Sequence, residues 1–196
     1  MEHSSDIFKI KTNNVAPQKG RVLIAEPFLG GHYFNRSVIL LVAYSAKGAV
    51  GFVLNKPVEV SLQEAFPDFP DFKASLYLGG PVSTDSLYFI HKLGKKIPGS
   101  IKVMDDLYWG GDFEVVKREI RLGLIHPSEI RFFIGYSGWD AGQLEDELKE
   151  DSWLVTESGT NAVMQQLDKN SWFDFVKRAG SRYKVWRNFP QNPSFN

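Results

Sequence analysis

The 196-residue chain contains no cysteine, and this absence excludes several kinds of chemistry at once. A chain without thiols has no disulfide, no thiolate nucleophile, no iron–sulfur cluster and no cysteine-rich zinc site. Long apolar runs are also missing, since none approaches the roughly 18 residues that a membrane-spanning helix needs. Residues 1–6 lack the basic and then apolar pattern of a secretory signal peptide. We therefore expect a cytoplasmic protein that does not associate with a membrane.

An excess of charge of one sign is missing as well, because 23 lysines and arginines balance 23 aspartates and glutamates. No global field therefore attracts nucleic acid or anionic lipid. The four histidines show no His-x-x-x-His spacing, and no glycine-rich phosphate-binding motif joins a strand to a helix. We expect neither a metal centre nor a cofactor.

The apolar content is high enough for a well-packed core, since 43% of the residues are hydrophobic and 14% are aromatic. Residues 1–19 are predicted to form a polar N-terminal arm. Within it, residues 7–10 carry enough apolar surface to dock, so a free arm and a docked arm both stay open. We expect a single domain over residues 20–182, because no linker rich in glycine, serine or proline divides it. Residues 183–196 would then form a C-terminal extension.

Short β-branched or alternating runs, bounded by turn residues, indicate strands. We predict strands over residues 22–25, 38–44, 50–54, 75–78, 86–90, 101–103, 130–134 and 153–155. The turn at Lys47 and Gly48 is too short for a parallel crossover, so the second and third of these strands must be antiparallel. The fourth and fifth strands lie around a turn at residues 79–81.

Helix start signals occur at several places along the chain. Ser61 can cap a short helix, and Asp112 can cap a helix that ends near Gly123. Asp140 and Gln143 form a capping-box pattern, with Trp139 placed to pack on the helix that follows. Two more helices are predicted over residues 160–168 and 171–179. The predicted strands lie mainly in the earlier part of the chain and the predicted helices mainly in the later part. This order indicates the α+β class.

Five blocks of sequence follow one another in the order of a known family. They are residues 20–27, 34–38, 48–57, 78–82 and 135–145. Together they resemble the bacterial YqgE/AlgH family. The resemblance implies an α+β fold in which a bifurcated antiparallel sheet curls into a partial barrel, with helices packed against it. The activity of that family is not established. Some members are named as transcriptional regulators, although this chain shows no helix-turn-helix with a basic recognition helix.

Polar residues in the matched blocks lie where apolar strands end or a helix begins. Together with neighbouring backbone N–H groups they make up a predicted binding site of eight residues: Arg36, Asn55, Lys56, Gly79, Gly80, Ser137, Trp139 and Gln143. Arg36 and Lys56 would face an anionic group, which the backbone N–H groups would help to hold. A structural interpretation stays open, in which residues 55–57 only end a strand and Arg36 only pairs with Glu26 or Glu145.

The resulting hypothesis is a non-enzymatic binding or regulatory protein whose partner is a protein or an anionic small molecule. An alternative is a hydrolase or transferase that uses Ser137, because residues 135–139 are similar to a nucleophile elbow. Against this, Trp139 stands where the elbow has glycine, and no histidine follows Ser137 in the chain.

A second alternative concerns the C-terminal part, which is rich in basic and aromatic residues. Its basic residues are Lys177, Arg178, Arg182, Lys184 and Arg187, interleaved with Tyr183 and Trp186. Phosphate contacts and base stacking there would bind RNA or single-stranded DNA. The aromatic residues near Trp186 and Phe189 would equally suit a dimer surface, so an oligomer is open.

Overall fold

A computed structural model describes residues 11–13 and 15–189 of the chain. The strands are β1 (Val22–Ala25), β2 (Val38–Ser45), β3 (Gly48–Val53), β4 (Leu76–Leu78), β5 (Val82–His91), β6 (Ile101–Met104), β7 (Leu107–Trp109), β8 (Ile130–Asp140) and β9 (Trp153–Thr156). The α-helices are α1 (Leu62–Ala65), α2 (Phe113–Arg121), α3 (Gln143–Lys149), α4 (Thr160–Met164) and α5 (Ser171–Ala179). Three 3₁₀ segments accompany them: η2 (Gly94–Lys96), η3 (Pro127–Glu129) and η4 (Ser181–Asn188).

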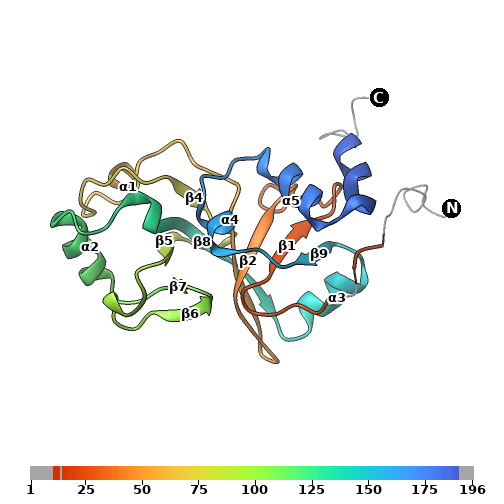
Figure 1. The fold of residues 1–196 in the computed structure, drawn as a ribbon, viewed down its shortest axis with the longest axis horizontal. Coiled ribbons are helices and arrows are strands. Elements are labelled where there is room, and N and C mark those ends of the chain that lie inside the picture. The colour runs from red at the N-terminus through yellow and green to blue at the C-terminus, as the bar shows by residue number, and fades with distance from the viewer. Residues whose placement is uncertain (1–10, 14, 190–196) are drawn as a thin grey trace.

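The strands form one sheet that divides at β8, and it does not close into a barrel (Figure 1). The strand order is β6-β7-β5-β8-β3-β2-β1-β9, with β4 paired to β8 outside this path. The first half of β8 pairs with β5 and β4, and its second half pairs with β3. This is the predicted bifurcated arrangement, and the α+β class is confirmed.

One pairing differs from the antiparallel pattern, because β4 runs parallel to β8. Phe132 of β8 is opposite both Leu76 of β4 and Phe89 of β5, so β8 lies between these two strands. The turn at residues 79–81 therefore does not join neighbouring strands. The long chain between β4 and β8 has room for the crossover that a parallel pair requires.

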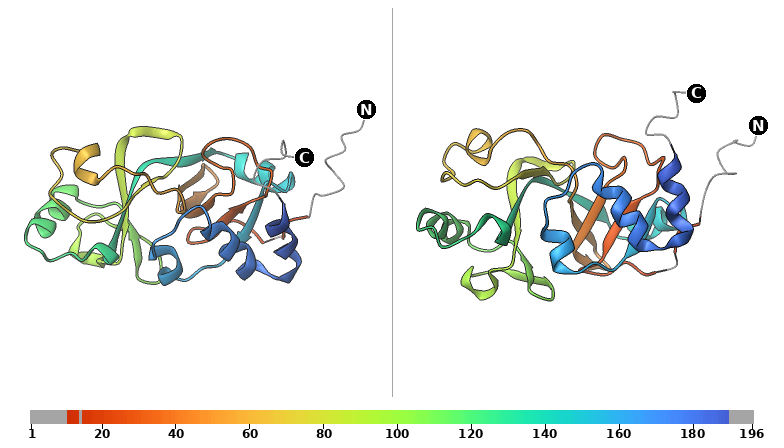
Figure 2. Two further views of the ribbon diagram at one scale, coloured as in Figure 1. Left: turned by 90° about the horizontal axis from the view of Figure 1, so that it is seen from above. Right: turned by 45° about the horizontal axis from the view of Figure 1, so that its top comes forward.

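Helices cover both faces of the half of the sheet that contains β1 and β2 (Figure 2). Val22 and Ile24 pack into a core with Trp172 of α5, whereas Leu23 faces a second core that contains Leu144 of α3. This alternation explains why β1 is apolar at every position, since both of its faces are buried. A third core lies around α1 and α2 at the opposite end of the molecule.

Two of the predicted helix starts are confirmed, and one is wrong. Ser61 forms a full capping box on α1, and Asp112 caps α2. Asp140 does not cap α3, because β8 continues to Asp140 and Gly142, with φ +80°, is the N-cap. The third start was misread because a strand, and not a turn, occupies residues 135–140.

Other element bounds also differ from the sequence prediction. Helix α4 ends at Met164, four residues before the predicted end at residue 168. Strand β5 begins at Val82, four residues before the predicted start at residue 86. The short strand β7 and the segments η2 and η3 carry too few residues to show a periodic pattern, and the sequence did not reveal them.

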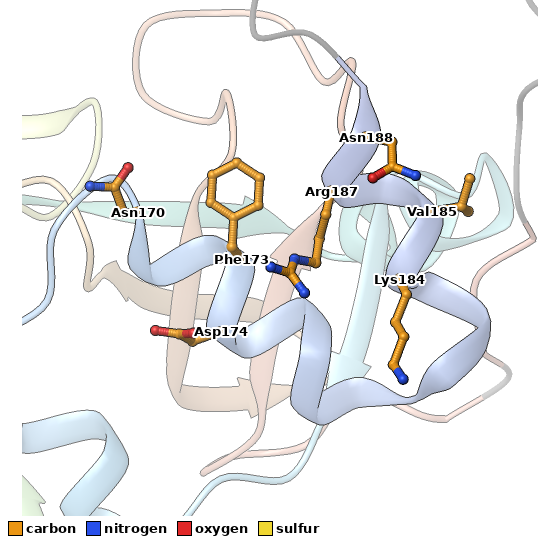
Figure 3. Close-up of a pocket in the computed structure, with 7 residues that line it drawn as sticks. All are labelled: Asn170, Phe173, Asp174, Lys184, Val185, Arg187 and Asn188. Carbon is orange, nitrogen blue, oxygen red and sulfur yellow. The ribbon is translucent and has the colours of Figure 1, made fainter.

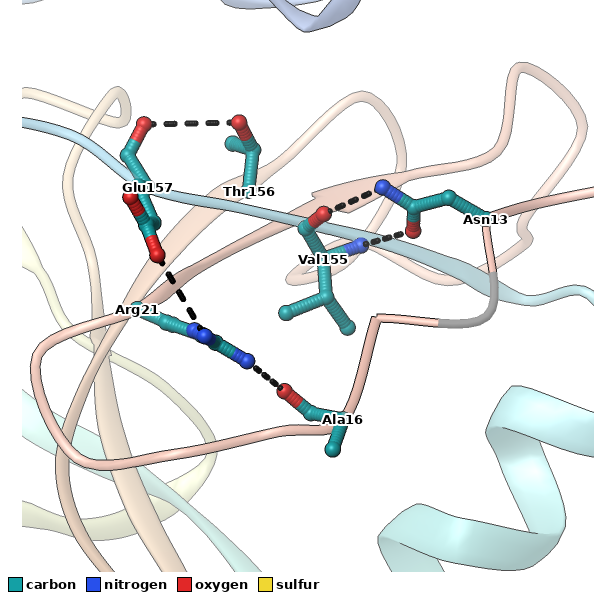
Figure 4. A network of polar contacts seen from close by, with 6 residues as sticks. All are labelled: Asn13, Ala16, Arg21, Val155, Thr156 and Glu157. Carbon is teal, nitrogen blue, oxygen red and sulfur yellow. Dashed lines mark hydrogen bonds and ion pairs between the residues drawn. The ribbon is translucent and has the colours of Figure 1, made fainter.

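The described part of the N-terminal arm docks along strand β9 (Figure 4). The Asn13 side chain donates to the carbonyl of Val155 at 2.7 Å and accepts from its N–H at 3.2 Å. The main-chain N–H and the hydroxyl of Thr12 both donate to Asp151. These contacts cover the edge strand, which would otherwise expose unpaired backbone groups. The predicted apolar docking segment, residues 7–10, lies outside the described residues.

The described part of the C-terminal extension, residues 183–189, packs as part of the main core. Tyr183 and Trp186 of η4 are 2% and 1% exposed, and Trp186 stacks on Trp172 with ring centres 6.3 Å apart. The boundary expected at residue 182 therefore does not coincide with an edge of the core. Trp186 is not available for a dimer surface.

Within the described ranges, no helix is long and apolar enough to cross a bilayer.

A buried histidine lies at the end of β5. His91 Nδ1 accepts from the N–H of Leu93 at 3.2 Å, and Nε2 lies 3.1 Å from the carbonyl oxygen of Gly110. Because Nδ1 accepts, Nε2 carries the proton of a neutral ring. Burial lowers the pKa of His91, although the Gly110 carbonyl acts in the opposite direction.

Stability should therefore fall on acidification. The unfolded chain takes up a proton near pH 6.5 and the folded chain only at lower pH, so protonation favours unfolding. The free energy of unfolding should drop as the pH falls below about 6.5 and level off below the folded-state pKa, with a His91 contribution of at most about 1.4 kcal/mol per pH unit. Denaturant unfolding of the wild type and of His91→Gln over this range measures that contribution. An equal pH dependence in both proteins would contradict it.

Candidate functional site

A pocket of about 470 Å³ lies where the end of β3, the turn before β2 and the loop before α5 meet. It is lined by Asn35, Arg36, Asn55, Lys56, Pro57, Glu59, Asp168 and Lys169. Three of the eight predicted site residues, Arg36, Asn55 and Lys56, thus lie around one cavity. Folding adds Asp168 and Lys169 from a distant part of the chain, which sequence reasoning missed.

Arg36 is buried in the wall of this pocket, with 5% of its surface exposed and a left-handed φ of +48°. Its Nη2 donates to the carbonyl of Phe189. Its guanidinium carbon lies 5.0 Å and 5.2 Å from the ring centres of Trp172 and Phe173. Contacts with ring faces stabilise a cation, but they do not neutralise its charge.

The same guanidinium has no acidic partner in the described part of the chain. Its Nε is buried without a hydrogen-bond partner. Glu145, one of the two partners considered from the sequence, accepts from the hydroxyl of Tyr44 instead. Arg36 therefore brings a buried positive charge and an unused donor to the cavity.

The Asn55 side chain forms hydrogen bonds with the backbone of the turn that contains Arg36. It is fully buried; its Oδ1 accepts from the N–H of Val38 at 2.9 Å, and its Nδ2 donates to the carbonyl of Arg36 at 2.9 Å. The side chain holds residues 36–38 in place and with them the strained φ of Arg36. Its part in the site is to position Arg36.

Lys56 follows Asn55 in the sequence and adds a further positive charge to the lining of the pocket. Its Nζ donates to the carbonyl of His32 at 2.7 Å, and burial lowers its pKa. Burial also lowers the pKa of Arg36. For Asp168 burial opposes ionisation, but hydrogen bonds from Asn170 and Ser171 outweigh it and lower the pKa. Three cations and two carboxylates line the pocket, an excess of one positive charge.

Gly79, Gly80 and Ser137 lie outside the Arg36 pocket, where the chain that follows β4 passes close to β8. Ser137 is fully buried, and its hydroxyl donates to the carbonyl of Gly79 at 3.1 Å. The N–H of Gly79 is already bonded to the carbonyl of Ile134. These three residues hold the sheet together and do not line the Arg36 pocket.

The position of Ser137 also bears on the hydrolase alternative. Residues 135–139 lie inside β8, with Ser137 paired to Gly51, and do not form an exposed turn. A buried serine whose hydroxyl donates to a carbonyl is not presented to a substrate. The sequence pattern of a nucleophile elbow was misleading here.

Trp139 and Gln143 support helix α3. Trp139 is 6% exposed, and its Nε1 donates to Glu147 at 2.8 Å, as does the Nε1 of Trp153 at 2.7 Å. Gln143 is exposed, accepts from the N–H of Asp140 and donates to Glu147. The eight predicted residues thus separate into three places, of which only the Arg36 pocket is a cavity.

The basic C-terminal stretch borders a further pocket, drawn in Figure 3, which Lys184 and Arg187 line together with Asp174 and Phe173. The two aromatic residues on which nucleic-acid stacking depended, Tyr183 and Trp186, are buried. Arg182 donates to the carbonyl of Lys11. Base stacking on these rings, which was the mechanism predicted, is therefore not available.

A second buried arginine, Arg131 of β8, was missed. It is 4% exposed and lines another cavity. The signal in the sequence was a single arginine inside the apolar run of residues 130–134. Among the described residues, no group of three or more histidine, aspartate or glutamate side chains is placed to hold a metal ion.

Comparison with known proteins assigns the family. The AlgH-like family model matches residues 22–184. The chain belongs to the AlgH-like family. Its relatives include proteins called UPF0301 from Bacteroides thetaiotaomicron and Parabacteroides distasonis, which are 42% identical over 197 residues and 43% identical over 198 residues. Both alignments cover 100% of this chain and of the relative. The resemblance in the five sequence blocks is confirmed.

Solved structures support the fold. The solution structure of the AlgH protein from Pseudomonas aeruginosa superposes with a TM-score of 0.70 at 26% identity, covering 91% of this chain and 98% of that one. A crystal structure of a protein from Corynebacterium diphtheriae gives a TM-score of 0.70 at 24% identity, covering 92% and 95%. The AlgH-like fold thus extends over almost the whole described chain.

We predict that Ser137→Ala folds and costs only about 1 kcal/mol of stability, because the Gly79 carbonyl keeps its bond from the N–H of Val53. A fluorophosphonate probe should not label the wild-type protein. Denaturant unfolding and probe labelling followed by mass spectrometry check both statements. Labelling of the wild type at Ser137 that is lost in the variant would restore the hydrolase alternative.

Proposed function

We propose that this AlgH-like protein is a non-enzymatic binding protein that recognises the anionic group of a small molecule in the Arg36 pocket. One observation carries the proposal: Arg36 is buried, lines the cavity and keeps an Nε–H without a partner. A buried charge without a counter-ion is costly unless something pairs with it. A bound carboxylate or phosphate would supply that partner.

The other lining groups narrow the chemistry of the ligand. A guanidinium favours planar or tetrahedral oxyanions, and Lys56 and Lys169 add two further positive charges. Glu59 and Asp168 also line the pocket and would accept hydrogen bonds from donors on the ligand. We therefore expect an anionic group on a polar body that also carries hydroxyl or amino groups. The volume suits a small molecule better than a folded partner.

The regulatory part of the proposal rests on the bond from Arg36 to the carbonyl of Phe189. A bound anion would compete with this carbonyl for the same guanidinium. Phe189 also packs on Phe28 with ring centres 5.0 Å apart. A bound anion that displaces the Phe189 carbonyl would therefore also disturb this aromatic contact at the end of η4. Binding would then change how Phe189 is held at the end of η4, and a regulatory partner could recognise that change. We place this function in the cytoplasm, because a chain without cysteine gains nothing from an oxidising compartment.

The proposal predicts that Lys56→Gln weakens the binding of inorganic phosphate about tenfold, the effect of losing one charge-assisted hydrogen bond of roughly 1.5 kcal/mol. Lys56 is preferable to Arg36 for this test, because Arg36 also supports the fold through Trp172 and Phe189. Phosphate is titrated into ¹⁵N-labelled protein while the amide signals of residues 35–37 and 55–56 are followed.

The matched control is Lys47→Gln, which removes a lysine on the exposed β2–β3 turn. Its affinity for phosphate should equal that of the wild type. Equal affinities in the wild type and in Lys56→Gln, or phosphate-induced shifts that spare the residues of the pocket, would contradict the proposed function.

A further inference from the structure

A second arginine is buried at the junction of the two halves of the sheet. Arg131 of β8 donates through Nη1 to the carbonyl of Val163, in the last turn of α4, and through Nη2 to the carbonyl of Leu54 at 2.6 Å. Its guanidinium carbon lies 4.0 Å from the ring centre of Tyr77. The side chain thus connects β8, β4, the end of β3 and α4, which lie together in Figure 1.

These contacts do not neutralise the positive charge of Arg131. No carboxylate among the described residues forms an ion pair with it, and its Nε is buried without a hydrogen-bond partner. Burial lowers the pKa of Arg131 to about 10, so that the group still carries its proton at neutral pH. The bonds to main-chain carbonyls and the contact with the Tyr77 ring offset part of the free-energy cost of removing the guanidinium from water. They leave its full positive charge in place.

This charge lies in the wall of a cavity of about 350 Å³ whose lining contains no acidic side chain. Lys73 adds a second cation, and Ser75, Ser128 and Gln165 add uncharged donors. The Arg36 pocket differs, because Glu59 and Asp168 line it. The Arg131 cavity therefore has the more strongly positive lining of the two.

The apolar residues of the lining indicate which group the ligand carries beside its anionic group. Ile130, Met164 and Ala74 give the cavity a hydrophobic wall beside the guanidinium. Burial of an alkyl group against that wall would add to the electrostatic attraction. A cavity of this size holds a small organic molecule and is too small for a folded domain.

We propose that the Arg131 cavity is a second binding site, specific for a small organic acid whose anionic group lies against Arg131 and Lys73 and whose apolar body lies against Ile130 and Met164. The site is independent of the proposed function, since it shares no lining residue with the Arg36 pocket.

Hexanoate and 1-hexanol form a matched pair of probes, with the same carbon chain with and without the charge. Each is titrated into ¹⁵N-labelled protein while the Nε–H signal of Arg131 is followed. Hexanoate should shift this signal in a saturable way, and hexanol should bind at least about tenfold more weakly. Equal affinity for the two probes, or an unmoved Arg131 signal at saturation, would overturn the proposal.

Variants at the exposed rim avoid the misfolding that loss of Arg131 itself would risk. Gln165→Glu adds a carboxylate without a change of shape, and Lys73→Gln removes a cation. Each should weaken hexanoate binding, as read from the Arg131 signal, by about threefold or more, whereas Lys56→Gln in the other pocket should leave the titration of that signal unchanged. Unchanged affinity in both rim variants would overturn the proposal. Weakening by Lys56→Gln alone would assign the binding to the Arg36 pocket and would equally overturn it.

Discussion

The close approach of two glycines to strand β8 is the constraint on which the rest of the structure depends. Gly79 donates to the carbonyl of Ile134, and its own carbonyl accepts from the N–H of Val53 and from the Ser137 hydroxyl. A Cβ at Gly79 would lie 2.3 Å from the carbonyl oxygen of Gly135, and one at Gly80 would lie 2.3 Å from the backbone of Tyr136. Only glycine leaves room for these contacts. Through them one strand, β8, belongs to both halves of a divided sheet.

The two arginine cavities share one pattern of contacts. In each, a buried guanidinium donates to a main-chain carbonyl, lies over an aromatic ring and has no carboxylate partner among the described residues. Arg36 stands on the turn before β2, and Arg131 stands in β8 itself. A charge held in this way in a low-dielectric wall attracts anions more strongly than an exposed lysine does. The proposed anion binding rests on these two guanidinium groups, and Ser137, the serine singled out in the sequence as a nucleophile, is buried.

Much of the local structure could be predicted from the sequence, because short-range physics determines it. The apolar runs of β1, β2 and β3, and the caps at Ser61 and Asp112, depend on neighbouring residues only. The segment at residues 135–140 was misread because glycines and a capping pattern suggest a turn, whereas pairing with β3 extends the strand. That pairing is a tertiary effect, and local propensity does not contain it.

The candidate site was predictable only in part, for the same reason. Asn55 and Lys56 are adjacent in the sequence, and the antiparallel pairing of β2 with β3, which the short turn at Lys47 and Gly48 predicts, brings them beside Arg36. Asp168 and Lys169 reach the same cavity through the packing of the loop before α5, which no local pattern encodes. Ser137 and Trp139 do not line that cavity, because the Ser137 hydroxyl donates to the carbonyl of Gly79 and the Trp139 Nε1 donates to Glu147.

The most direct measurement of the central claim is the position of an anion in a crystal. Crystals of the full chain soaked in bromide, with diffraction recorded at the bromine absorption edge, locate the ion without assuming a ligand. The account predicts anomalous peaks beside Arg36 and Lys56 and beside Arg131. Bromide bound on exposed lysines, with both cavities empty of it, would contradict the claim that these buried arginines are anion-binding groups.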